Sequence, residues 1–402
     1  MTSLVGGLLG ELADVGRTRK GGYDRRAWTG VDVECRQWFV QCADALDLDV
    51  ETDRNGNLWA WWQPSLPRTA LVLGSHLDSV PQGGAYDGPL GIASAFAAIG
   101  ALRRDGFAPG RPVAVAAFAD EEGARFGAAC VGSRLLTGAL RREEALELRD
   151  DDGTTLAEAL RRAGVEPEHV GRDEERLQRI GEFLELHIEQ GHLPTRAGTG
   201  ALGLAAAGAA VGVSDRIWPH GRWRVDLTGQ QNHAGTTPMG ARRDPLVRLA
   251  DIVLAVREGA IAAGALATVG RVTVSPGAVN AVAGSATLWI DARAAHEPTV
   301  RRVLAHVRRV TGAELLEESW TAETAFDQGL TASLSEILGA VPVLPSGAGH
   351  DAGVLSLAGI PAAMILVRNP TGVSHAPDEH AEDDDCERGV DALVTAIRHR
   401  AA

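Results

Sequence analysis

Two continuous apolar runs in the first third of the chain have the length and composition of buried strands. They are Leu71–Ser75 and Val113–Phe118, and a Gly-Arg-Pro turn precedes the second. Between them, Gly91–Arg104 carries small and apolar residues at helical spacing. Strand, helix and strand form the unit of an α/β sheet, in which ligands bind at the carboxyl ends of the strands. We therefore expect polar residues that directly follow these strands to lie at a binding edge.

A second region arranges strands and helices in a different order. Its predicted strands are Trp223–Gly229, Ala267–Val274, Ala286–Ala292 and Glu314–Trp320, and its predicted helices are Pro245–Glu258 and Pro298–Thr311. The order β-α-β-β-α-β is that of the ferredoxin-like motif. An α/β pattern then returns near Leu334–Leu338 and Ala362–Val367.

These patterns predict an α/β fold with a central mixed sheet flanked by helices and an inserted ferredoxin-like α+β domain. A chain of 402 residues exceeds the about 250–300 residues at which single cores stop growing. We assign residues 1–212 and 325–402 to the main domain and residues 213–324 to the insertion. Ala197–Val213, rich in glycine and alanine, is either the first connection or one helix of the main domain. The charge-rich segment Arg141–Arg176 is expected to form a solvated helical layer.

Charge excludes two classes of partner. The chain has 39 Lys and Arg against 53 Asp and Glu, a formal net charge of −14, so nucleic acid and anionic membranes are poor partners. A small anionic substrate remains compatible, because local cations can dominate the field of a site.

The cysteines and the start of the chain bear on the compartment. The four cysteines form no C-x-x-C pair, which indicates free thiols in a reducing environment. Residues 1–17 carry Glu11 and Asp14 and no basic leader, so they predict an amphipathic helix rather than a signal peptide. No apolar run approaches the ~20 residues that span a bilayer. We expect a cytoplasmic protein.

The densest polar motif follows the first predicted strand. His76 and Asp78 stand in Gly-Ser-His-Leu-Asp-Ser-Val, and Asp87 follows in a glycine-rich loop. A metal-ligating imidazole needs a carboxylate or carbonyl on its other nitrogen, and His-x-Asp can supply both. Asp87 is placed as a carboxylate that could bridge two cations. The alternative is a capping aspartate beside a surface histidine.

Three consecutive carboxylates, Asp120, Glu121 and Glu122, follow the second strand. They repel one another unless cations neutralise them, although at a solvated turn they would be unremarkable. Beside His76, one glutamate could ligate a metal while its neighbour acts as general base.

Two further histidines follow apolar strand patterns. They are His187 in Leu-His-Ile-Glu-Gln-Gly and His375 in Gly-Val-Ser-His-Ala-Pro-Asp-Glu, and either alone would more often be structural. Together, three imidazoles and several carboxylates suit Zn²⁺, Mn²⁺, Co²⁺ or Ni²⁺. No Gly-x-Ser-x-Gly elbow or phosphate loop is present. The tryptophans at 59, 61 and 62 indicate core or edge-strand packing.

Taken together, the motifs resemble the family of N-carbamoyl-L-amino-acid hydrolases, ureidopropionases and allantoate amidohydrolases, which is related to aminoacylases and carboxypeptidases. The resemblance runs from Gly56-Asn57-Leu58 to the Ser-His-x-Pro-x-Glu segment. It implies two divalent transition-metal ions per chain, one held by His76, Asp87 and His187 and the other by Asp87, Glu122 and His375, with Asp87 bridging. It also implies Glu121 as general base and Asp78 as the residue that orients His76.

The resemblance extends to the substrate. It implies that His233 stabilises the oxyanion, reaching in from a partner subunit or by lid closure, and that Asn280 and Arg293 bind the substrate carboxylate. Gln190, Gly349 and His350 match residues near the ureido end. For Arg293 the alternative is a surface arginine on an edge strand. The insertion would serve as a lid and as the dimerisation domain of a homodimer.

The implied activity is metal-dependent hydrolysis of the ureido C–N bond of a small carboxylate, with release of ammonia and CO₂. An aminoacylase or dipeptidase on the same metal centre is the second possibility, and His187 argues against it. A scaffold that has lost catalysis is the third. The segment Gly229-Gln230-Gln231-Asn232-His233 departs from the usual family pattern, so carbamoyl amino acids, β-ureidopropionate and allantoate all remain open as substrates.

Overall fold

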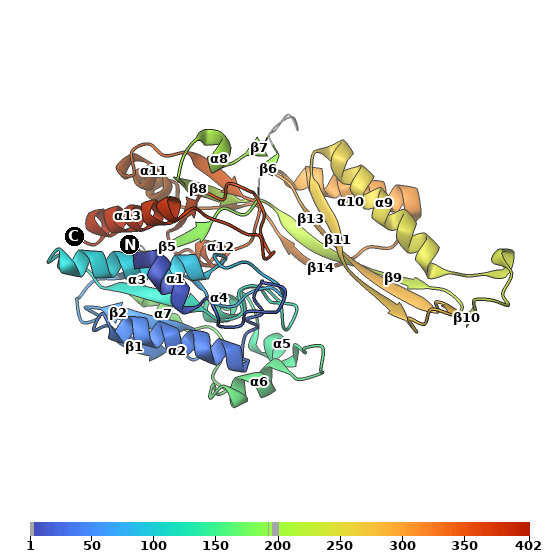
Figure 1. Cartoon of the computed structure of the whole chain (residues 1–402), viewed down its shortest axis with the longest axis horizontal. Coiled ribbons are helices and arrows are strands. Elements are labelled where there is room, and N and C mark those ends of the chain that lie inside the picture. Colours follow the sequence, from blue (N-terminus) through green and yellow to red (C-terminus); the bar gives the residue numbers. More distant parts are fainter. Residues whose placement is uncertain (1–3, 192, 195–200) are drawn as a thin grey trace. The chain divides into compact units, whose positions relative to one another are not determined.

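The computed structural model of the chain describes residues 4–191, 193–194 and 201–402 (Figure 1). It divides into two compact units. The first comprises Met1–His192, Leu202–Arg216 and Ala325–Ala402, and the second comprises Leu193–Ala201 and Ile217–Thr324. The described helices include none that is both long enough and apolar enough to cross a membrane.

The first unit alternates strands and helices along the chain. Its helices are α1 (Leu4–Glu11), α2 (Gly30–Asp44), α3 (Pro89–Arg104), α4 (Val131–Thr137), α5 (Arg142–Glu147), α6 (Leu156–Arg162), α7 (Glu174–Arg179), α8 (Leu204–Ala207), α11 (Gln328–Ile337), α12 (Asp351–Leu357) and α13 (Asp383–Arg400). Its main strands are β1 (Asp49–Thr52), β2 (Leu58–Trp62), β3 (Ala70–His76), β4 (Val113–Phe118), β5 (Ile180–Ile188), β8 (Val211–Ile217), β15 (Thr324–Ala325), β16 (Val343–Ser346) and β17 (Ala362–Val367). The short strands β6 (Leu193–Pro194) and β7 (Ala201–Leu202) pair with each other.

These main strands form one mixed sheet. Among the described residues its order is β1-β2-β4-β3-β5-β17-β8-β15, with β16 paired to β8. β4, β3, β5 and β17 run parallel, whereas β2 and β8 flank them in the antiparallel direction. The two strands predicted first in the sequence are therefore confirmed as parallel neighbours, with Leu71 opposite Val113.

Burial explains why the central strands have continuous apolar sequences. Every residue of β3, β4 and β17 is buried, as expected for parallel strands that are covered on both faces. On one side α3 packs against β3 and β5, and α13 packs against α3 and β17. The alanines and glycines of α3 allow this close approach, and nearly all of the helix is buried.

The three tryptophans of β2 belong to the core. Trp59, Trp61 and Trp62 are all buried, and β2 lies between β1 and β4, so the edge-strand alternative is wrong. Trp59 and Trp61 stack with ring centroids 5.9 Å apart.

The second unit has the predicted order of elements. β9 (His220–Thr228), α9 (Pro245–Ala263), β11 (Leu266–Ser275), β13 (Ser285–Arg293), α10 (Glu297–Thr311) and β14 (Leu316–Thr321) follow one another, with the shorter β10 (Asn232–His233), η1 (Met239–Ala241) and β12 (Ala281–Val282) between them. The four long strands form an antiparallel sheet in the order β11-β13-β9-β14. Buried residues alternate with more exposed ones along β9 and β13, and the buried face packs under α9 and α10. The fold class is confirmed: a mixed α/β sheet with helices and a separate antiparallel sheet.

Two local predictions need adjustment. The helix expected over residues 1–17 ends at Glu11, within the part of that segment that the structure describes. The buried Arg25 explains this end, because its guanidinium donates to the carbonyls of Leu12 and Val15 and satisfies them outside a helix. Of the connection predicted at Ala197–Val213, residues 197–200 lie outside the described residues, and the remainder contains α8 and the start of β8.

Candidate metal centre

Loops that follow four neighbouring strands meet at one edge of the first sheet. Because β4, β3, β5 and β17 run parallel, their carboxyl ends lie together at this edge. The predicted ligands and their neighbours occupy these positions: His76 ends β3, Asp87 lies between β3 and α3, Glu121 and Glu122 follow β4, His187 is the next-to-last residue of β5, and His375 follows β17.

Asp87 is the centre of the cluster. Its Oδ1 lies 3.5 Å from Nε2 of His76 and 3.1 Å from Nε2 of His187. Its Oδ2 lies 3.2 Å from Nε2 of His375, which in turn lies 3.4 Å from Oε1 of Glu122. One carboxylate thus faces three imidazoles, with one oxygen toward each of two groups of ligand atoms.

The donor set fits a pair of divalent cations. His76, Asp87 and His187 form one group whose ligand atoms lie within 4.8 Å of one another, and Asp87, Glu122 and His375 form another. Nε2 of His187 and Oε1 of Glu122 are buried and make no hydrogen bond to any part of the chain that the structure describes. Buried polar atoms without partners are costly, and one cation in each group would satisfy them.

The backbone beside Asp87 fits tightly around His76. Gly88 has φ +85°, and a Cβ at this position would lie 2.5 Å from Cε1 of His76. Only glycine accommodates both the left-handed backbone and the imidazole that lies against it.

Asp78 acts on the cluster through its backbone and its side chain. Its carbonyl oxygen lies 3.0 Å from Nδ1 of His76, whereas its Oδ1 is 3.6 Å away. A proton on Nδ1 shared with this carbonyl would leave Nε2 of His76 available to a metal. The carboxylate of Asp78 accepts the backbone N–H groups of Glu121 and Glu122, both at 3.1 Å. Asp78 therefore fixes both the imidazole and the loop that carries the two glutamates.

Glu121 lies beside the ligands without joining either group. Its Oε2 is 3.9 Å from Nε2 of His76, and its Oε1 accepts a hydrogen bond from Sγ of Cys130 at 3.3 Å. Burial, together with the nearby Asp351 and Glu122 carboxylates, holds the pKa of Glu121 well above its usual range. A buried carboxyl group with a raised pKa accepts a proton more readily than a solvated one, which suits a group that carries a proton.

The pKa values around Asp87 reflect negative charge that is crowded into a buried site. Burial and the neighbouring Asp87 raise the pKa of Glu122 to about 7. Burial alone would raise the pKa of Asp87 too, but the imidazoles of His187, His375 and His76 hold it well below its usual range. Burial lowers the pKa of His375, and Asp87 and Glu122 more than offset this and raise it to about 9. In the metal-free protein, protons on the imidazoles balance the carboxylates.

Two of the residues predicted to contact substrate lie at this cluster. Nε2 of Gln190 donates to Oδ2 of Asp87 at 2.8 Å. His350 is the N-cap of α12, directly after Gly349, and its ring lies edge-on to that of His187 with centroids 4.5 Å apart. Glu185, His187 and His350 form a third group of potential ligand atoms, which shares His187 with the first.

The other predicted substrate residues belong to the second unit. His233 pairs with Ala281 between β10 and β12, and the adjacent Ala234 donates its N–H to the carbonyl of Asn280 at 3.0 Å. Arg293 ends β13, which lies between β11 and β9, so the edge-strand alternative for this arginine is wrong. Its guanidinium contacts both carboxylate oxygens of Asp291 at 2.7 Å.

Cys130 and Glu379 lie at the centre and received no role from the sequence. Cys130 contacts Glu121, as described above, and Glu379 accepts hydrogen bonds from the backbone of Tyr86 and Asp87. Glu379 stands in the same Ser-His-x-Pro-x-Glu segment as His375, so its presence in that pattern was the available signal. No pattern in the sequence pointed to Cys130.

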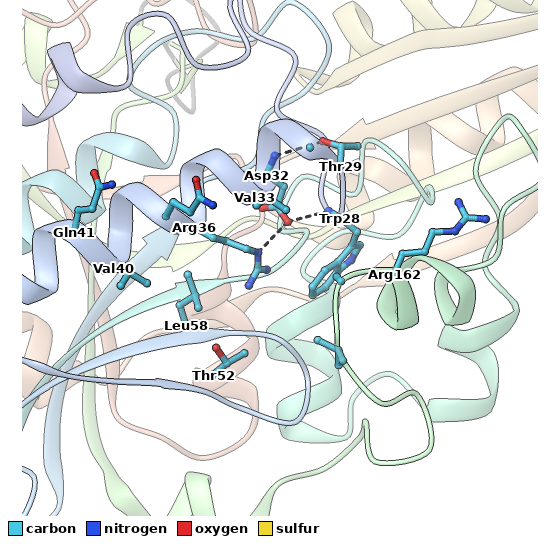
Figure 2. Close-up of a pocket in the computed structure, with 14 residues that line it drawn as sticks. Trp28, Thr29, Asp32, Val33, Arg36, Val40, Gln41, Thr52, Leu58 and Arg162 are labelled. Carbon is cyan, nitrogen blue, oxygen red and sulfur yellow. Dashed lines mark hydrogen bonds and ion pairs between the residues drawn. The ribbon is translucent and has the colours of Figure 1, made fainter.

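A separate cavity of about 640 Å³ lies beside α2 (Figure 2). Its walls include Trp28, Val33, Leu58 and Arg162. Polar groups that line it bind one another, because the Asp32 carboxylate accepts from the Trp28 N–H and from Nε of Arg36. None of the predicted site residues is among those that line it.

Comparison with known proteins places the chain in a family. Residues 72–399 match the model of peptidase family M20/M25/M40. The chain is 35% identical over 404 residues to an N-carbamoyl-L-amino acid amidohydrolase of Geobacillus stearothermophilus, which covers 96% of this chain and 95% of the relative. It is 31% identical over 402 residues to the allantoate amidohydrolase of Escherichia coli, with 96% and 95% covered. The crystal structure of a hydantoinase/carbamoylase family amidase from Burkholderia vietnamiensis superposes with a TM-score of 0.88 at 31% identity, with 99% and 96% covered.

The chain therefore belongs to peptidase family M20/M25/M40. Within it, the full-length similarity to carbamoyl-amino-acid and allantoate hydrolases makes it an amidohydrolase of that type, a hydrolase that acts on C–N bonds. The resemblance inferred from the motifs is confirmed.

Proposed function

We propose that this protein hydrolyses the ureido C–N bond of a small carboxylate-bearing substrate, an N-carbamoyl-L-amino acid or allantoate, and releases ammonia and CO₂. The observation that carries the proposal is the position of Asp87 between two groups of ligand atoms. His76 and His187 complete one group, and Glu122 and His375 complete the other. This donor set suits Zn²⁺, Mn²⁺, Co²⁺ or Ni²⁺.

Two bound cations would supply Lewis acidity, lowering the pKa of water and polarising the substrate carbonyl. The side chains divide the remaining work. Glu121, adjacent to the cluster and buried with a raised pKa, takes a proton from water and returns it to the leaving nitrogen. His233 stabilises the oxyanion that develops on the carbonyl, a contribution of about 3–4 kcal/mol for one well-placed donor.

We expect the protein to recognise both ends of the substrate, the ureido group and the carboxylate. Gln190 and His350 contact Asp87 and His187 at the metal cluster, and they would bind the ureido group together with the backbone of Gly349. Arg293 offers a planar fork for the carboxylate that these substrates share, with Asn280 as a second donor. The carboxylate of Asp291 occupies the fork in the structure, so substrate must displace or share this partner.

The second unit supports a homodimer with a composite site. His233 and Asn280 lie next to β12, close to the start of β13, whereas Arg293 ends β13. The eight residue steps from Ser285 to Arg293 separate the two ends by roughly 26 Å. One small substrate cannot reach both ends of the same chain, so His233 and Arg293 would come from different subunits.

The exposed edge of the second unit offers a place for that contact. β11 is an edge strand of ten residues with Leu266, Val272 and Val274 exposed, and α9 exposes Leu254 and Ile261. Exposed edges of this length tend to be paired or covered, and a second subunit would do so here.

Subunit mixing tests the composite site. His233→Ala and Arg293→Ala proteins should each be inactive, and a refolded equimolar mixture should regain about a quarter of wild-type activity, because half of the dimers then contain one intact site. A monomer in light scattering, or a mixture without activity, would refute the dimer.

Ammonia release tests the activity itself. Metal-stripped protein is supplied with Zn²⁺, Mn²⁺, Co²⁺ or Ni²⁺ and assayed on N-carbamoyl-L-amino acids, β-ureidopropionate and allantoate, with N-acetyl amino acids and dipeptides alongside. We expect metal-dependent ammonia release from at least one ureido substrate. Release of acetate or of a free amino acid from the last two alone would identify an aminoacylase or dipeptidase instead, and no turnover with two ions bound would identify a scaffold.

A further inference from the structure

Glu379 connects two loops of the candidate metal centre that are far apart in the sequence. Its Oε1 accepts the backbone N–H groups of Tyr86 and Asp87, both at 3.0 Å, and its Oε2 accepts the hydroxyl of Ser374 at 3.1 Å. Asp87 is in the loop between β3 and α3, and Ser374 is next to His375 in the loop after β17. A single carboxylate therefore ties the loop of the central ligand to the loop of His375.

The carboxylate is built into this position. Glu379 is only 5% exposed. A Cβ at Gly84 would lie 2.1 Å from its Oε1, so the glutamate rests directly on the backbone of the first loop. The three groups that donate to it are neutral, and none of them is a metal ligand atom, so its bonds can persist when cations are bound.

The ligands differ in how firmly the fold holds them. His76 and His187 stand in paired strands of the sheet, and their side chains are 1% exposed. His375 stands in a loop at φ +55°, and its side chain is 48% exposed. A non-glycine residue in the left-handed region costs energy and needs support from its surroundings. Of the three imidazoles, His375 depends most on a contact that fixes its loop.

We infer that Glu379 is a positioning residue that fixes the spacing between Asp87 and His375 and thereby sets the affinity of the cation held by Asp87, Glu122 and His375. This inference rests on the metal set of the proposed function. The cation held by His76, Asp87 and His187 should be affected less, because two of its three ligands are fixed by the sheet. Partners that orient metal ligands typically change metal affinity by about 10–100-fold when they are removed.

Metal titration of the stripped full-length protein with Co²⁺, followed by absorbance and calorimetry, tests the role. Wild type should bind two ions. Glu379→Ala should bind one ion with nearly wild-type affinity and the second at least about tenfold more weakly. Ser374→Ala removes only the bond to the His375 loop and should weaken the second ion by a smaller factor, which keeps the test valid if Glu379→Ala does not fold.

Arg368→Gln provides the matched control. Arg368 anchors the same loop to α13 through a two-point pair with Asp385 at 2.7 and 2.8 Å, without touching Asp87. This variant should lose thermal stability and still bind both ions as wild type does. The inference would be overturned if Glu379→Ala bound both ions with wild-type affinity. It would also be overturned if Glu379→Ala and Arg368→Gln weakened the binding of both ions to the same extent. Wild type that binds fewer than two ions would instead overturn the proposed function.

Discussion

At the residue scale, the chemistry of the centre depends on which atom of each side chain faces the cluster. The motifs predicted which residues form the centre, because His, Asp and Glu that occur together directly after buried strands are typical of a metal site. They did not predict that the carbonyl of Asp78 contacts His76 while its carboxylate accepts a hydrogen bond from the backbone N–H of Glu121. Such assignments depend on side-chain directions that only the folded backbone determines.

Because Glu121 is proposed as a proton carrier and not as a ligand, its substitution should affect turnover and leave metal binding intact. Glu121→Gln should bind both ions and lose about 10²–10⁴-fold in kcat, because the amide keeps the shape of the side chain but cannot carry the proton. Metal analysis and steady-state kinetics on the same preparation measure the two effects. Loss of an ion in this variant would make Glu121 a ligand and leave the proton transfer without a carrier.

Metal binding should release protons at pH 7. His375, with a pKa of about 9, is mostly protonated in the metal-free protein, and Glu122, with a pKa of about 7, is about half protonated. Both must lose their protons to coordinate, so metal affinity should rise with pH up to about 9. Calorimetric titrations in buffers of different ionisation enthalpy count the protons released. Heats that do not depend on the buffer would show that these groups are already deprotonated.

At the element scale, the site exists because four parallel strands end at one edge. The sequence predicted β3, α3 and β4 within a few residues, since their apolar runs are continuous and bounded by turns. It could not predict that β5 and β17 are the next strands in the sheet, because strand order is decided by contacts between distant segments. The meeting of His187 and His375 at Asp87 therefore followed from the resemblance and not from periodicity.

Gly88 allows a test of the connection between β3 and α3. Gly88→Ala places a Cβ against His76 and forces a left-handed residue, so it should cost about 1–3 kcal/mol and weaken metal binding. Gly106, just after α3, has φ +70° and open space around its Cβ position. Gly106→Ala is thus a control for backbone strain alone, and it should lose stability while keeping both ions.

Thermal melts with and without metal would measure this difference. If Gly88→Ala and Gly106→Ala behaved alike in metal affinity, the close approach of Gly88 to His76 would not matter for the site.

At the scale of the whole molecule, the chain forms two units, each with its own hydrophobic core. The ferredoxin-like order was readable from the sequence because its helices and strands are long and strongly patterned. Along β13, buried residues such as Leu288 and Ile290 alternate with more exposed ones. The surroundings of Arg293 could not be predicted from the sequence, because only the order of strands in the sheet shows that its strand is central.

The stability of the metal-free protein should fall as pH rises. The folded-state pKa values of Glu122 and Glu379, each about 7, and of His375, about 9, all exceed their ordinary values of 4.5 and 6.5. The folded state therefore binds more protons than the unfolded state between about pH 4.5 and 9, and the free energy of unfolding decreases across that window. The lowered pKa of Asp87 acts in the opposite direction only below 3.8.

Chelator-treated protein should thus melt at a lower temperature at pH 9 than at pH 6, and added metal should restore most of the difference, since cations replace the lost protons. A metal-free protein that is more stable at pH 9 would contradict the crowded-carboxylate description of the site.

Anomalous diffraction from crystals grown with Mn²⁺ or Zn²⁺ tests the central claim most directly. We predict two anomalous peaks, one on each side of the Asp87 carboxylate, with His76 and His187 at the first and Glu122 and His375 at the second. A single peak, or peaks away from Asp87 under saturating metal, would contradict a dinuclear centre and the hydrolysis proposed to depend on it.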